Sequence, residues 1–271
     1  MDTQDLLALY DLEERILAQP AGMRREETSY VVRHVPPEPR NGYRDGFISY
    51  SHLAEHEVAP AIDQQVRFFD SLGLAFEWKV YSHDAPPDLR QRLAAYGFEV
   101  EEGEAIMALA LDSAPPQLLA PVSHDVRRLE DPDQLDDVMA VQQAVWQQDL
   151  SGQAGDLRDT MILHPELIAV YAAYAGGQPV ASARLYYDGR SPFASLWGGS
   201  TVASYRQQGI YTALLAVRVQ EAIRRGARFL TIDASAMSQP IVARFGFQHL
   251  TTAHACNWRP QRSAVPLKPL P

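Results

Sequence analysis

Six consecutive residues, Arg206-Gln207-Gln208-Gly209-Ile210-Tyr211, carry the strongest chemical signal in the sequence. Arg206 supplies a permanent positive charge with a forked donor geometry that suits phosphate oxygens. Gly209 lets the backbone approach a ligand closely because it has no Cβ atom. The first N–H groups of a helix that starts at this point have no intrahelical partner and attract anions. The segment therefore predicts a pyrophosphate-binding turn.

The flanking residues predict the elements that position this turn. Residues 194–202 are typical of a strand, and the segment after the turn is apolar at intervals of three and four, which indicates an amphipathic helix ending at Gly226. A second strand is predicted over 228–234 and a short helix over 238–245, closed by Gly246-Phe247.

This order of elements around an Arg-x-x-Gly turn resembles the GNAT superfamily of acyl-CoA-dependent N-acyltransferases, from about His124 to Trp258. The resemblance implies that the amides of the turn hold the pyrophosphate of acetyl-CoA and that Val202 and Ala203 face the pantetheine arm. Ser235 stands where the family often has a CoA-contacting Asn. The implied cofactor-binding residues are Val202, Ala203, Arg206, Gln207, Gln208, Gly209, Ile210, Tyr211, Thr212 and Ser235.

Two positions depart from the family pattern. Tyr211 stands where Gly or Ala is usual, and Val242 stands where a Tyr often acts as the general acid. No catalytic residue is assigned, and Asp233 and Glu166 are candidate bases by their chemistry alone. Two functions remain open: transfer of an acetyl group from acetyl-CoA to a primary amine by direct attack, or a catalytically silent acyl-CoA-binding sensor or scaffold.

The first half of the chain repeats the pattern. Gly73-Leu74-Ala75-Phe76 matches Gly226-Ala227-Arg228-Phe229, and Tyr96-Gly97-Phe98 matches Phe245-Gly246-Phe247. We therefore expect a tandem α/β fold of mixed sheets, in which two GNAT-like domains each have a mostly antiparallel central sheet flanked by helices. The expected boundaries are 1–113 for the first domain, 114–122 for a linker, 123–260 for the acyl-CoA-binding domain and 261–271 for a Pro-rich tail.

The first copy lacks the chemistry of the second. Aligning Gly73 with Gly226 without gaps places Leu53 on Arg206 and His56 on Gly209. Leu53 carries no charge, and His56 has a Cβ atom where close backbone approach is needed. The first domain is therefore expected to be degenerate, with a role in packing or in shaping a substrate cleft.

Composition narrows the function classes further. The 24 basic and 34 acidic residues give a net charge of −10, which disfavours nucleic acid and anionic membranes as partners and fits an amine substrate, either a small molecule or a peptide. The single cysteine, Cys256, excludes an intramolecular disulfide framework. No metal is expected, because the His52-Leu53-Ala54-Glu55-His56 motif lies between a strand and Pro60 rather than on a long helix. A cytoplasmic monomer or homodimer is the expectation.

Overall fold

The glycine spacing predicts two strand–helix–strand units, and both are present in the structure, a computed structural model that describes residues 1–37, 45–147 and 151–260. In the first half, β3 (Gly46–Ser51) and β4 (Phe76–Tyr81) pair in parallel, and α2 (Val58–Ser71) connects them. In the second half, β10 (Phe193–Thr201) and β11 (Phe229–Ala234) pair in parallel through α7 (Ile210–Arg224). β4 and β11 begin 153 residues apart, from 76 to 229, as do the glycines at 73 and 226. The sequence repeat is therefore a repeat of structure.

The rest of the first half comprises an N-terminal helix, a second short helix and four further strands. Their bounds are α1 (Thr3–Tyr10) with its π-helical continuation η1 (Asp11–Ile16), β1 (Arg24–Glu27), β2 (Val31–Val35), α3 (Leu89–Ala95), β5 (Glu99–Val100) and β6 (Glu104–Ala110). β1 gives no strand signal in the sequence because all four of its residues are charged. The segment 36–42 is rich in proline, which predicts a turn, and it lies largely outside the described residues.

The rest of the second half adds a three-stranded edge, four helices and a long last strand. Their bounds are α4 (Pro116–Leu119), β7 (Asp125–Leu129), α5 (Leu135–Trp146), α6 (Ser151–Leu163), β8 (Ile168–Ala175), β9 (Gln178–Tyr187), α8 (Gln239–Ala243) and β12 (Gln248–Trp258). The Gly176-Gly177 pair, which favours a tight turn between two strands, joins β8 and β9 as a hairpin. The polar, glycine-containing sequence of 150–163 indicates no definite element, but 151–163 are helical, with Leu157 and Met161 buried one turn apart. The expected tail at 261–271 lies outside the described residues.

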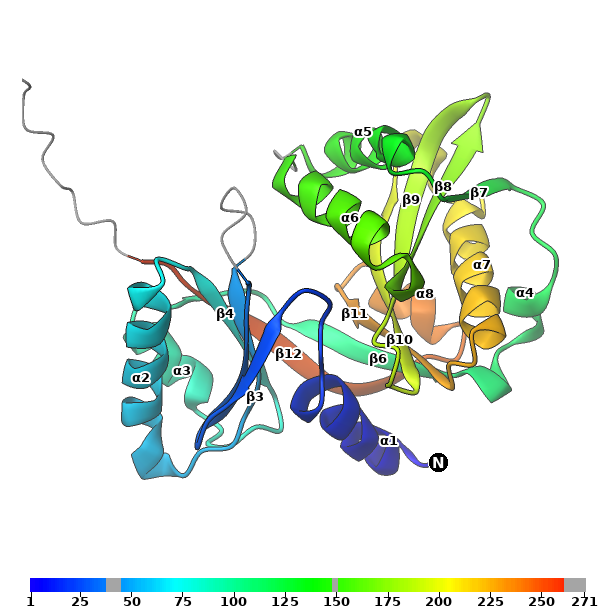
Figure 1. The fold of residues 1–271 in the computed structure, drawn as a ribbon. Coiled ribbons are helices and arrows are strands. Elements are labelled where there is room, and N and C mark those ends of the chain that lie inside the picture. The colour runs from blue at the N-terminus through cyan, green and yellow to red at the C-terminus, as the bar shows by residue number, and fades with distance from the viewer. Residues whose placement is uncertain (38–44, 148–150, 261–271) are drawn as a thin grey trace, which may run out of the picture.

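Within the described residues, twelve strands form one mixed sheet, so the predicted α/β class is confirmed. The order is β1-β2-β3-β4-β12-β6-β11-β10-β9-β8-β7, with β5 paired to β12. β6, from the first half of the chain, lies between β12 and β11, and β12, the last strand, lies between β6 and β4. Figure 1 shows these two strands crossing the middle of the molecule. Strands from both sides of the expected linker at 114–122 therefore alternate at the centre of the sheet.

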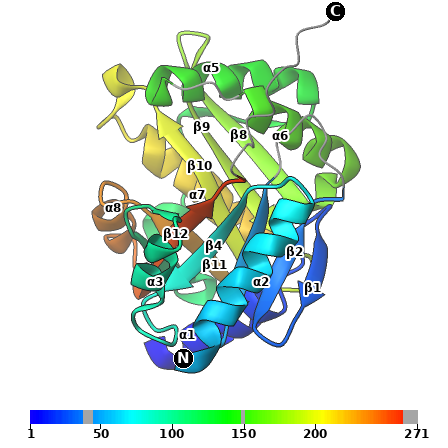
Figure 2. The same cartoon turned by 90° about the vertical axis from the view of Figure 1, so that its left-hand side faces the viewer.

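The two faces of the sheet have different coverings. Along β6, Met107 and Leu109 pack in the cluster that contains α7, whereas Ile106 and Ala108 pack in the cluster that contains α1. Alternate residues of a strand point to opposite faces, so α1 and α7 lie on opposite sides. We call the side that α1 covers the α1 face. α5 and α6 pack over β8 and β9, as Figure 2 shows.

A buried arginine fixes the N-terminal segment to the first half. The Arg15 guanidinium pairs with Asp11 and Asp84, both at 2.7 Å, and its Nε donates to the Ser49 carbonyl. It also lies 3.8 Å from the centre of the Tyr81 ring. Burial opposes the charge, but the two carboxylates and Tyr81 outweigh it and raise the pKa of Arg15. The ion pairs thus hold η1 over the sheet.

His34 is a buried group that makes stability depend on pH. Its side chain in β2 is fully buried, its Nε2 lies 3.0 Å from Ser49 Oγ, and its ring stacks on Phe47. Nδ1 has no hydrogen-bond partner within the part of the chain that the structure describes. Burial, with a smaller contribution from Arg25, lowers the pKa of His34 to about 4. An unfolded chain protonates the same imidazole near pH 6.5.

We expect the free energy of unfolding to fall as the pH drops from about 6.5 towards 4, because the unfolded state then binds a proton that the folded state excludes. The loss from this one group approaches roughly 3 kcal/mol at pH 4. Urea unfolding of the wild type and of His34→Gln at several pH values measures it, since the variant lacks this contribution. His249→Gln, which removes an exposed histidine, is the matched control. Parallel pH curves for wild type and His34→Gln would contradict the assignment.

Candidate functional site

The turn between β10 and α7 has the backbone shape that an anion site requires. Gly209 is the N-cap of α7 with φ 80°, and Gln207 is also left-handed with φ 61°. A residue with a side chain adopts this region at a steric cost, so glycine at 209 is dictated by conformation as well as by space. The Ala213 N–H donates to the Gly209 carbonyl and starts the helix. The preceding amides point out of the helix end towards solvent.

The arginine of the motif lies beside this turn. Arg206 is exposed, and its Nε donates to the Thr201 carbonyl at 3.1 Å, which ties the side chain to the end of β10. Its charge is therefore fixed where the strand meets the turn. Such a guanidinium is positioned to pair with phosphate oxygens.

The structure adds His124 to the turn, a residue for which the sequence gives no signal. Its Nε2 lies 2.9 Å from the Gln208 carbonyl oxygen, and its ring carbon Cε1 lies 3.2 Å from where a Cβ atom of residue 209 would stand. His124 immediately precedes β7 and is more than eighty residues away along the chain. Only the fold brings the two together.

β10 and β11 separate at the level of the turn. Their parallel pairs run from Phe193–Phe229 to Leu196–Ile232, and from Trp197 onward β10 pairs only with β9 among the described residues. Two glycines inside a strand favour a bulge, and at Gly198-Gly199 the register of β10 with β9 does shift, between Trp197 and Ser200. The inner edge of β10 beyond Leu196 is thus left unpaired by β11. A gap of this kind offers backbone groups to an extended ligand.

The ten predicted cofactor residues gather around this gap and its turn. Ala203, Arg206, Gln207, Gln208, Gly209 and Ser235 are exposed, Val202, Tyr211 and Thr212 are half-buried, and Ile210 is buried. Ser235 follows β11 and lies 3.3 Å from Ser238 between their hydroxyl oxygens. The Tyr211 ring points back towards Gly199, 3.8 Å from the place of its absent Cβ, and its buried hydroxyl has no partner within the described residues. Burial raises the pKa of Tyr211.

The equivalent turn of the first copy is built differently. Leu53 is buried in the core of the first half, and His56 is exposed in the 3-10 turn Glu55–Glu57. The Glu57 carboxylate accepts from the Ala54 N–H at 2.8 Å just before α2, and Pro60 in the first turn of α2 has no N–H. A carboxylate at the helix N-terminus repels a phosphate. The His52–His56 motif forms no long helix either.

The two candidate bases occupy different places. Asp233 follows the last β10–β11 pair, and its carboxylate forms an ion pair with Lys79 of β4 on the α1 face. The carbonyl of Glu166 accepts from Arg225, which follows α7, so Glu166 lies near the end of that helix opposite to the turn. The structure brings Asp233, but not Glu166, to the gap.

The groups around Asp233 form a charged cluster. Burial opposes a charged Lys79, but the Asp233 carboxylate, with Tyr81 and Glu77, outweighs it and raises the pKa of the lysine. Burial also raises the pKa of Glu77, and burial together with Asp233 raises that of Glu104. Three carboxylates therefore surround one ammonium. The cluster favours a further cation.

Two other residues singled out in the sequence are buried and inert. Val242 is fully buried in α8 and has no proton to donate. Cys256 is fully buried in β12, and burial raises the pKa of its thiol to about 12. A thiol with that pKa is not a nucleophile at neutral pH.

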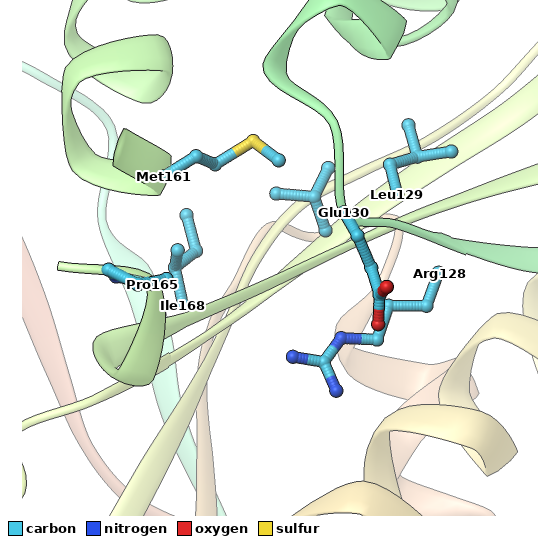
Figure 3. A pocket seen from close by; sticks show the side chains of 7 residues that line it. Arg128, Leu129, Glu130, Met161, Pro165 and Ile168 are labelled. Atoms are coloured by element: carbon cyan, nitrogen blue, oxygen red, sulfur yellow. The ribbon is translucent and has the colours of Figure 1, made fainter. Parts of the chain in front are cut away.

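A pocket of about 220 Å³ lies apart from these residues, at the β7 edge of the sheet. Figure 3 shows Met161, Pro165 and Ile168 on one side of it and Arg128 and Glu130 on the other. None of the predicted site residues lines it. Among the described residues, no cluster of three or more His, Cys, Asp or Glu side chains could hold a metal ion. No helix in the described part of the chain is long and apolar enough to span a membrane.

Comparison with known proteins agrees with this geometry. The family model described as "Acetyltransferase (GNAT) family" matches residues 126–247. Residues 126–247, which make up somewhat less than half of the chain, thus resemble a GNAT acetyltransferase domain. A search of curated protein sequences gave no match.

Solved structures extend the likeness to nearly the whole chain. A GCN5-related N-acetyltransferase from Kribbella flavida has a TM-score of 0.65 at 16% identity, over 94% of this chain and 95% of that one. A functionally unknown conserved protein from Staphylococcus epidermidis reaches 0.69 at 12% identity, over 94% and 99%. A tandem GNAT protein from the clavulanic acid biosynthesis pathway reaches 0.60 at 11% identity, over 95% and 94%. At these identities the likeness concerns the fold, and it includes a tandem GNAT arrangement.

The position equivalent to Arg206 in the first copy should behave as a core position. We expect Leu53→Ala to lower the free energy of unfolding by about 2–5 kcal/mol, because it leaves a cavity in the first-half core. The adjacent exposed position is the control: His56→Ala should change stability by less than about 0.5 kcal/mol. Chemical denaturation measures both. Equal stability of the two variants would show that the first turn is not built into the core.

Proposed function

We propose that the protein is an N-acyltransferase that moves an acetyl group from acetyl-CoA to a primary amine by direct attack. The observation that carries this proposal is the separation of β10 from β11 beside the left-handed Gly209 turn. The turn amides and Arg206 would hold the pyrophosphate, and Val202 and Ala203 would face the pantetheine arm. The family match and the fold of the neighbours support the assignment.

The chemistry requires three things of the site. The amine must lose a proton, the thioester oxygen must be stabilised as charge develops, and the thiolate must leave. The free N–H groups along the unpaired edge of β10 are suited to the second task. Water in contact with Asp233 and the neighbouring carboxylates would take the proton.

Val242 favours a second candidate, a CoA-binding protein without turnover. Its buried isopropyl group stands where the family often has a general acid. We rank this candidate second because a thiolate leaves readily without a protonating group. A thiol-release assay over a panel of primary amines and amino acids separates the two candidates. Release above the rate of acetyl-CoA hydrolysis with any acceptor supports the transferase, and binding of acetyl-CoA with no release from any acceptor supports the silent protein.

One CoA should bind per chain, in the second half only. Arg206→Ala should weaken CoA binding roughly 10- to 150-fold, because a charge-assisted phosphate contact is worth about 1.5–3 kcal/mol. Gly209→Ala should weaken it as well, because the new Cβ stands at φ 80°, close to His124 and in the path of the phosphate. Titration calorimetry measures both the affinity and the stoichiometry.

The controls for this experiment come from the first copy. Arg67→Ala removes one exposed positive charge from α2, and His56→Val changes the position equivalent to Gly209. Both should leave the CoA affinity within about twofold, because distant sites rarely couple by more than a few tenths of a kcal/mol. Two CoA per chain, or loss of binding in His56→Val alone, would show that the live and degenerate copies are the reverse of our assignment.

A further inference from the structure

The guanidinium of Arg184 lies over the β10 bulge, in the space that a side chain at position 198 would occupy. It lies in β9 opposite Trp197 of β10. A Cβ atom on Gly198 would stand 2.6 Å from Arg184 Nη2 and 2.7 Å from its Nε, closer than any real contact. The guanidinium therefore rests on the bare backbone of Gly198, whose φ of 58° also calls for glycine. This puts a positive charge beside the gap between β10 and β11.

This charge has no counter-ion among the residues that the structure describes. The buried Nε of Arg184 has no hydrogen-bond partner, and no carboxylate pairs with its guanidinium, among residues 1–37, 45–147 and 151–260. Two more buried polar atoms have no hydrogen-bond partner in the described part of the chain: Ser182 Oγ, two residues earlier on the same face of β9, and Gln142 Oε1 on α5. Both side chains are at least 97% buried, and buried polar groups almost always have partners.

α5 covers the polar residues Ser182 and Ser200 on one face of the sheet. Trp146 Nε1 donates to Ser200 Oγ at 3.0 Å, and Ser200 pairs with Ser182 across the strands. Gln142 stands four residues before Trp146, on the same side of α5. The unpartnered groups of Arg184 and Ser182 thus lie on the face of β9 that α5 covers, because these residues pair with Val170 and Ala172, which pack against α5. Their grouping is typical of a site that binds a polar ligand.

The other side of the gap carries the opposite charge. Arg184 lies level with Trp197, and Trp197 is one residue beyond the last β10–β11 pair, as Asp233 is on β11. Trp197 and Asp233 each lie four residues after a phenylalanine that packs with α1, Phe193 on β10 and Phe229 on β11, so their side chains point to the α1 face. Arg184 points to the same face because it pairs with Trp197. Trp197 is 46% exposed between them. A ligand over the gap therefore meets an unpaired cation on one side and the carboxylates of Asp233, Glu77 and Glu104 on the other.

We propose that Arg184 binds the carboxylate of the acceptor, and that the acceptor is a free amino acid. This inference rests on the proposed acyl transfer and names its substrate class. The ammonium group faces the Asp233 side of the gap, and the carboxylate pairs with the guanidinium, which has no ionic partner in the described ranges. An amine without a carboxylate leaves Arg184 unpaired. Arg184 is thus a specificity-determining residue, and Gly198 positions it.

Matched acceptor pairs test the proposal. Each free amino acid is compared with the amine formed by its decarboxylation: phenylalanine with 2-phenylethylamine, leucine with isoamylamine, and lysine with cadaverine. The wild type should acylate at least one amino acid with a higher kcat/KM than its amine. Arg184→Gln should lower kcat/KM for that amino acid roughly 10- to 150-fold, mainly through KM, and should leave the amine unchanged. Arg184→Lys should fall in between, because an ammonium cannot hold a carboxylate in a fork.

Arg190→Gln is the matched control. Arg190 is an exposed arginine in the turn that follows β9, so its loss changes the net charge equally and should affect neither acceptor series. CoA affinity is measured in parallel and should be unchanged in Arg184→Gln, which separates a failure of this inference from a failure of the proposed function. Amines that react as well as their amino acids, or an equal loss for both series in Arg184→Gln, overturns the proposal. If no acceptor is acylated, calorimetry of the same amino acids into the CoA complex decides, and absence of binding overturns it.

Discussion

The short parallel pairing of β10 with β11 is the constraint on which the site depends. Parallel strands cannot be joined by a tight turn, so the chain must cross back through a helix. α7 therefore begins at the ends of both strands, where its first amides lie beside their last residues. Only four residue pairs join the strands before they separate, and the β10 bulge adds to the divergence. The helix end, the unpaired edge of β10 and Asp233 all meet at this one place for that reason.

The first copy contributes to the same region although its own turn lacks the anion-binding features. β6 and β12 cross between the halves, so β4 and β11 lie in one continuous sheet. Lys79 of β4 can then reach Asp233 of β11, and Glu77 and Glu104 approach from the first half as well. Separation of the halves would expose the edges of β4, β6, β11 and β12 at once, and unpaired strand edges are unfavourable. The strand exchange thus brings charged side chains of the first copy to the end of β11, next to the gap.

Local signals in the sequence predict the crossover units well and the edges poorly. Glycines at 73, 97, 226 and 246 end helices with positive φ, and these positions set the repeat. The sequence gives no strand signal for β7 and β1, because charged residues dominate these two solvent-facing edge strands. α6 is missed because Leu157 and Met161 are its few buried apolar residues. No local sequence pattern predicts the positions of His124 and Arg184, because each side chain is positioned by a contact with a distant part of the sequence.

The two copies show which part of such a site the fold supplies and which part the side chains supply. Both retain the parallel pair and the connecting helix, because apolar packing against the sheet maintains them. The first copy replaces the charged residue by a core leucine, the left-handed glycine by a histidine, and a free helix end by one with Glu57 and Pro60. The loss of the positive charge, the carboxylate at the helix end and the missing N–H of Pro60 each weaken the attraction for a phosphate. A helix N-terminus alone therefore does not provide the features on which the proposed CoA site rests. The second copy adds them, because the left-handed Gly209 leaves the turn amides open and β10 separates from β11 beside the turn.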